Sequence, residues 1–134
     1  MAERMFLRLY EANDTWTKQA NLIKLWTWAI GEGGEGAGAA ANAASDGGGG
    51  QGGGVGFKEI LEAALGATEA VTVGNHCGNA TMAGQDGDPS SFGSHVTANG
   101  GKGGGYNATG HGIGGTGLGT AVDGDINMTG GNGQ

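Results

Sequence analysis

The chain has 134 residues, of which 34 are glycine, and a formal net charge of −7. This length allows a single domain, and the glycine share far exceeds the usual value of roughly 7%. Its six Lys and Arg residues are scattered through an acidic sequence, which excludes a basic nucleic-acid-binding surface.

The longest apolar run, residues 22–30, is interrupted by Lys24 and is too short to cross a bilayer, so we expect no membrane insertion. Arg4 and Arg8 interrupt the apolar positions of the N-terminus, so a signal-peptide core is not expected. Cys77 is the only cysteine and cannot form an internal disulfide. We therefore expect assembly in the host cytoplasm without secretory export.

The first predicted strand covers residues 5–10. Alternation places Met5, Leu7 and Leu9 on one of its faces. The Asn-Asp pair at 13–14 then signals a turn. Together with the next strand, this segment forms an N-terminal region, residues 1–30, which we expect to contribute to the core and to docking.

The second predicted strand covers residues 22–30 and is rich in β-forming residues. Leu22, Trp26, Trp28 and Ile30 share one face, and the opposite face is apolar as well. We therefore expect neighbouring structure to cover this strand on both sides. Core packing is the favoured role for its tryptophans, with ligand stacking as the alternative.

Residues 31–134 are predicted to form a glycine-rich β domain within one domain overall. The region 57–65 has apolar residues at the i, i+3, i+4, i+7 spacing of an amphipathic helix, and Gly66 would end it. Residues 71–74 read as a strand ending in a turn, and short strands are also expected at 95–98 and 125–128.

The glycines are concentrated in two tracts, with 13 in residues 31–56 and 15 from residue 100 onward. Ordering half of the 34 would cost on the order of 10 kcal/mol relative to alanine, similar to the stability of a typical domain. The alternatives are disorder or burial supplied by neighbouring copies. Ile113, Leu118 and Val122 among the glycines are unlike a flexible linker. We therefore expect extended segments with about three residues per turn, joined laterally by backbone hydrogen bonds.

Four blocks of the sequence, taken in order, resemble the glycine-rich domain of bacteriophage tail and tail-fibre proteins. The first is Thr15-Trp16-Thr17-Lys18, followed by a short apolar strand that runs into glycine. The others are residues 65–74, then 90–93 with 97–101, and finally 124–131. Together they cover nearly the whole chain.

This resemblance implies an all-β, small sandwich-like or jelly-roll-like domain with extended polyglycine segments. It also implies self-association, most simply as a homotrimer, and a strand at 57–65, which we favour over the helix because β-rich neighbours impose their own pairing. The function that it implies is that of a virion structural protein in a tail fibre or tail tip. Other virion proteins and a host cell-surface glycan or protein would be its partners.

The sequence offers little chemistry. His76, Cys77, His95 and His111 lack the paired short spacing of zinc ligands, although a trimer could bring copies of one histidine to its axis. The Asp-Gly-Asp triplets at 86–88 and 123–125 lack the rest of a calcium loop and are explained by turns. We therefore expect no catalysis and no cofactor.

Binding loops are the remaining expectation, because Asn, Tyr, Ser and Gly are typical of adaptable contact loops. The candidate receptor-contact residues are Asn75, His76, Asn79, Gln85, Asn99, Tyr106, Asn107, Thr109 and His111. Two alternatives stay open: a capsid decoration or spike protein of a phage, and a glycine-rich surface or ice-binding protein unrelated to phage.

Overall fold

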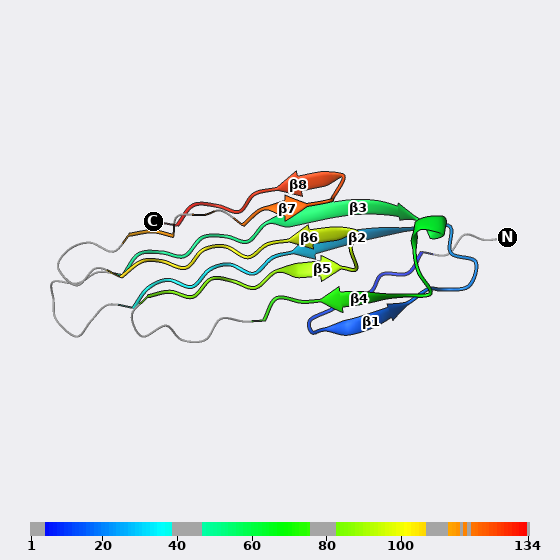
Figure 1. The fold of residues 1–134 in the computed structure, drawn as a ribbon, viewed down its shortest axis with the longest axis horizontal. Helices are drawn as coiled ribbons and strands as arrows, with labels where there is room; N and C mark the ends of the chain where they lie inside the picture. The colour runs from blue at the N-terminus through cyan, green and yellow to red at the C-terminus, as the bar shows by residue number, and fades with distance from the viewer. Residues whose placement is uncertain are drawn as a thin grey trace.

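The computed structural model of the chain describes residues 5–38, 47–75, 83–106, 113–115, 117 and 119–133. Within these residues the fold is all-β, with two antiparallel sheets packed face to face (Figure 1). This arrangement confirms the expected small sandwich. No described helix has the length and apolar character needed to cross a membrane.

The larger sheet has the strand order β1-β4-β5-β6-β7, and the smaller has the order β2-β3-β8. The larger sheet consists of β1 (Asp14–Thr17), β4 (Thr68–Thr72), β5 (Ser90–Phe92), β6 (Val96–Ala98) and β7 (Ala121–Val122). The smaller consists of β2 (Lys24–Ile30), β3 (Val55–Leu61) and β8 (Ile126–Met128). β2 packs mainly on β5 and β6, and β3 on β6 and β7, so the smaller sheet does not extend over β4 and β1. Val71 of β4 and Trp16 of β1 are nevertheless buried.

The core lies between the two sheets. Val96 and Ala98 of β6 are completely buried, and Trp16 meets Phe92 edge to face, with ring centroids 5.6 Å apart. Gly56 on β3 allows this close packing, because a Cβ there would lie 2.7 Å from Cγ2 of Val96. The tryptophan of the Thr-Trp-Thr motif is therefore a core residue.

The first part of the region 57–65 is a strand, as the resemblance implied, but the strand ends at Leu61. Residues 55–61 form β3, and only Glu62–Ala64 turn as a short 3-10 helix, η1. The helical spacing was misleading because β3 pairs along its length with β2, from Val55 opposite Ile30 to Leu61 opposite Lys24. Pairing with a neighbour outweighs the periodicity of a seven-residue segment.

Two expectations for the N-terminal region are wrong. Residues 5–10 form no strand, and Leu7 is 99% exposed, because alternation selects a face but supplies no partner strand. The strand β2 forms as expected, but only its inner face is covered. Trp26 and Trp28 are 51% and 59% exposed, so within one chain they are not core residues.

The glycine tracts are ordered in the described residues, as expected. Six segments continue β2, β3, β5, β6, β7 and β8 beyond the sandwich (Figure 1). Their described residues are 31–38, 47–54, 83–89, 99–106, 113–115 with 117 and 119–120, and 129–133. We call them the glycine bundle. Hydrogen bonds recur at every third residue, which is the period of a three-residue-per-turn extended helix. The N–H groups of Gly31, Gly34 and Ala37 donate to the carbonyls of Gly54, Gln51 and Gly48 at 2.8, 2.7 and 2.8 Å.

The bundle is also bonded across its two layers. Glu32 N–H donates to the carbonyl of Asp88 at 3.1 Å, and the carbonyl of Glu32 accepts from Gly101 N–H at 2.8 Å. In a sandwich, side chains hold sheets roughly 10 Å apart, whereas these layers touch through their backbones. Glycine is required for this contact, because a Cβ at Gly34 would lie 2.2 Å from the carbonyl oxygen of Lys102.

Candidate functional site

The structure does not gather the described candidate contact residues into one patch. Asn75 follows β4 and is exposed. Asn99 lies where the sandwich meets the bundle and bonds Thr120 through both its backbone and its side chain. Gln85 lies along the bundle, where its carbonyl accepts from Glu35 N–H. The other candidates, His76, Asn79, Asn107, Thr109 and His111, lie outside the described residues.

Tyr106 occupies a different position, at the end of the bundle farthest from the sandwich. It forms an isolated bridge with Gly47, and Gly105 forms one with Ile113. We call these ends of the segments the bundle tip. Ile113 is 61% exposed there. Asn107, Thr109 and His111 fall in the sequence between Tyr106 and Ile113, so four of the nine candidates belong to this connection.

A second surface, which the sequence did not single out, is the outer face of the smaller sheet. Cross-strand register aligns Trp28 with Phe57 and then Ile126, and the rings of Trp28 and Phe57 lie 4.8 Å apart. The next row aligns Ile30 with Val55 and Met128. We call this surface the aromatic face; its exposed members are Trp26, Trp28, Ile30, Ile126 and Met128.

One ionic group orders the edge of the aromatic face. Glu59 accepts from Lys24 Nζ at 2.9 Å and from Trp26 Nε1 at 2.5 Å. The Lys24 ammonium also lies 4.8 Å from the centre of the Trp26 ring. These two hydrogen bonds, the one from Lys24 first, hold the pKa of Glu59 below its usual value. The Trp26 ring is therefore held in position although it is exposed.

A groove runs along the free edge of β2. Its lining comes from residues 5–10 at the N-terminus, β2 itself, and residues 71–73 and 90–92 of the larger sheet. The Tyr10 hydroxyl is buried and finds no hydrogen-bond partner among the described residues. The groove thus combines apolar side chains, an open strand edge and one unsatisfied polar atom.

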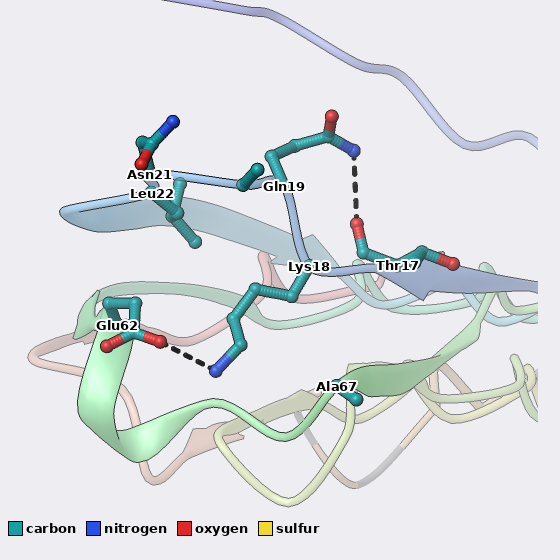
Figure 2. A pocket seen from close by; sticks show the side chains of 8 residues that line it. Thr17, Lys18, Gln19, Asn21, Leu22, Glu62 and Ala67 are labelled. Carbon is teal, nitrogen blue, oxygen red and sulfur yellow. Dashed lines mark hydrogen bonds and ion pairs between the residues drawn. The ribbon is translucent and has the colours of Figure 1, made fainter.

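A smaller hollow lies at the end of the sandwich near η1 (Figure 2). Lys18 Nζ there donates to Glu62 Oε1 at 2.7 Å and to the carbonyl of Leu65 at 3.0 Å, and Gln19 Nε2 donates to the carbonyl of Thr17 at 3.1 Å. Because the bonds of Lys18 tie this loop to η1 and Leu65, the hollow reads as a structural junction and not as a reactive site.

The charged groups suggested by the sequence have structural roles where they are described. Asp86 accepts from Lys102 Nζ at 2.5 Å and from Gly103 N–H at 3.0 Å, which clamps two bundle segments. Asp125 accepts from the backbone of Glu59 at 2.8 Å in the β7–β8 turn. Among the described residues no three His, Cys, Asp or Glu side chains come together as a metal site.

His76, Cys77 and His111 lie outside the described residues. His95 is in the turn between β5 and β6, where its Nε2 lies 3.3 Å from Glu69 Oε1.

Comparison with protein-family models, with curated proteins and with solved structures finds no match for this chain. The candidate sites therefore stand on geometry alone. Of these, the aromatic face could have been foreseen in part, because the alternation of Trp26 and Trp28 defines one face of a strand. The sequence contains no signal for whether another layer covers that face.

Proposed function

We propose that this chain is a structural module of a phage virion, located in a tail fibre or tail tip, where it contributes to host attachment without catalysis. The observation that carries the proposal is the glycine bundle. Its segments are joined within and across two layers by backbone hydrogen bonds at every third residue. Such a bundle is a stiff spacer that holds the bundle tip away from the sandwich.

The two ends of the molecule suit different tasks. The aromatic face lies at the sandwich end and exposes a contiguous apolar surface, which is typical of protein–protein contact. The bundle tip presents Tyr106 and, next in the sequence, polar residues suited to weak and repeated contacts. Docking through the sandwich in several copies would raise the avidity of such contacts. A homotrimer that binds other virion proteins through the sandwich and a host glycan or protein through the tip fits this division.

Competition tests the attachment role. Purified protein at micromolar concentration is expected to reduce adsorption of the phage to its host cells. Tyr106→Ala is expected to weaken this competition, whereas Asn75→Ala, on the flank near the sandwich, is the matched control and should leave it unchanged. Equal competition by both variants would place the contact away from the tip, and no competition by the unaltered protein would argue against attachment.

A capsid decoration protein is the second candidate, and the aromatic face is the observation that favours it. In that role the apolar sheet would clamp a capsid surface and the bundle would project outward. Electron microscopy of intact particles with the subunit labelled separates the two, because label on the tail supports the first proposal and label over the capsid shell supports the second.

A further inference from the structure

We infer that residues 5–9, the N-terminal arm, insert as a strand into the groove beside β2 of a second copy of this chain. The inference goes beyond attachment: it names the partner and the contact through which copies assemble. It depends on the self-association contained in the proposed function but not on any host contact. Three observations carry it: an open strand edge, a missing strand position and an exposed strand-like segment.

The open edge is that of β2. Two backbone hydrogen bonds flank β2: Glu62 N–H donates to the carbonyl of Ile23, and Gly31 N–H donates to the carbonyl of Gly54. Both Ile23 and Gly31 are odd-numbered, so the odd-numbered residues of β2 direct their N–H and C=O groups toward β3. Since antiparallel partners alternate, the N–H and C=O groups of Trp26 and Trp28 point to the other side. No strand of the described chain pairs with β2 on that side. A long apolar edge of this kind is a template for strand addition.

The missing position follows from the unequal sheets. The larger sheet has five strands and the smaller has three, and β2 packs on β5 and β6, so a strand added beyond β2 would lie over β4. The groove occupies this position, with Val71 and Val73 in its lining. An added backbone would also bring carbonyl groups near the buried Tyr10 hydroxyl, which lacks an acceptor among the described residues.

The N-terminal arm has the pattern that this position requires. Met5, Leu7 and Leu9 alternate along it and are 86%, 99% and 80% exposed. The arm of the same chain borders the groove, yet it forms no strand there. Its ionic contact is Arg8 with Asp14, at 3.1 Å, just before β1. Tyr10 packs against the core of its own chain, whereas the apolar side chains before it stay exposed beside an edge that they do not pair with. We therefore assign the groove to the arm of another copy.

The area is sufficient for a specific contact. Inserting the three alternating apolar side chains of the arm removes on the order of 600 Å² from water, counting both surfaces. Each copy has one arm and one groove, so exchange closes into a ring in which each copy makes this contact twice. Each copy therefore buries roughly 600 Å² of its own surface, half on its arm and half in its groove, which is at the lower end of the area that each partner buries in a specific interface.

Sedimentation equilibrium of the full chain at low micromolar concentration is the first test. The unaltered protein is expected to be a closed oligomer, with a trimer as the expected mass. The double variant Leu7→Asp/Leu9→Asp is expected to raise the dissociation constant by about 100-fold or more. Ile113→Asp makes one such apolar-to-aspartate change at an exposed residue of the bundle tip and should leave the mass unchanged. A monomeric unaltered protein, or an oligomer that is insensitive to the double variant, would overturn the inference.

Complementation tests the exchange itself. Trp28→Pro removes an N–H that faces the open edge and spares the ladder to β3, whereas Trp28→Val keeps the N–H and controls for loss of the ring. Mixing the arm-defective double variant with Trp28→Pro should produce a one-to-one heterodimer, because each supplies what the other lacks. Absence of a heterodimer from two folded variants would contradict exchange.

Cross-linking keeps the inference testable if Trp28→Pro fails to fold. A photoreactive amino acid at position 7 should cross-link to residues 24–30. In a mixture of ¹⁴N- and ¹⁵N-labelled chains the cross-linked peptides should be of mixed isotope composition. Cross-links only within one chain would show that the arm closes its own groove. Adsorption to host cells is a separate measurement, so failure of the attachment proposal would leave these results unaffected.

Discussion

Two adjacent glycines of the same bundle segment should respond in opposite directions to replacement by alanine. A Cβ at Gly33 would find its nearest atom, the carbonyl oxygen of Gln51, at 3.5 Å, which is ordinary contact. A Cβ at Gly34 would lie 2.2 Å from the carbonyl oxygen of Lys102. Both substitutions add one methyl group and reduce the entropy of the unfolded chain by the same amount. The difference between the two variants therefore measures the contact between the layers.

The magnitudes follow from these distances. Gly33→Ala restricts the unfolded chain and should stabilise the fold by about 0.4–1 kcal/mol. Gly34→Ala must separate two segments by about 1 Å, which would break the bonds of 2.8 Å from Gly101 N–H to Glu32 and from Gly104 N–H to Glu35. Losing two hydrogen bonds and leaving buried groups unsatisfied should cost about 2–4 kcal/mol. The two variants should therefore differ by roughly 2–5 kcal/mol in the free energy of unfolding.

Urea unfolding followed by tryptophan fluorescence measures this difference, because the three tryptophans lie in β1 and β2 of the sandwich. Hydrogen exchange at Gly101 and Gly104 reports the local effect and should accelerate in Gly34→Ala only. If both variants unfold within about 0.5 kcal/mol of each other, the layers are not in backbone contact. The stiffness assigned to the bundle would then have no physical basis.

Three further substitutions test other contacts. Gln51→Leu leaves the N–H of Gly117 without the side-chain oxygen that accepts it at 2.8 Å; unfolding free energy should fall by about 1–3 kcal/mol, with faster exchange at Gly117. The hydrogen bond from the Gly66 backbone holds the pKa of Glu69 below its usual value of 4.5, so its stabilising contribution is present above pH 4.5 and is lost as pH falls through the lower folded pKa. Glu69→Gln should therefore flatten the decline of Tm between about pH 5 and 3, and an unchanged slope would contradict this assignment. Trp16→Ala removes a buried core ring and should cost about 3–5 kcal/mol in urea unfolding; a loss under 1 kcal/mol would contradict its core role.

Much of the strand content could be predicted because local pattern determines it. Alternation and β-forming residues placed β2, β4, β6 and β8 within a few positions. The three-residue period of the bundle was also foreseeable, since glycine backbones can bond laterally only when no side chain intervenes. The strand β7 has two residues, too few for any pattern. Residues 5–10 show the converse, because they carry a strand pattern without a partner strand in the same chain.

The candidate sites were harder to predict, because they depend on distances between segments far apart in the sequence. Polar loop residues such as Asn75, Asn99 and Tyr106 look alike in the sequence, yet the fold separates the first two from the third by the length of the bundle. The exposure of Trp26 and Trp28 was missed for a related reason. Pairing with β3 determines which face each ring occupies, but only a further layer, outside this chain, would decide whether the rings are buried.

The sandwich and the bundle form one structure because the core narrows toward the glycines. Along β5 and β6 the inward side chains decrease from Phe92 and Val96 to Ser90 and Ala98, following the register of the two strands. On the facing sheet Ala29 pairs with Gly56 at the same end. As the side chains between them shrink, the two layers converge until backbone groups bond directly across the gap. The residues at this junction therefore determine where a side-chain core ends and a hydrogen-bonded glycine core begins. A stiff spacer requires that both cores be built on the same strands, as the described residues of the six bundle segments and their adjoining strands are.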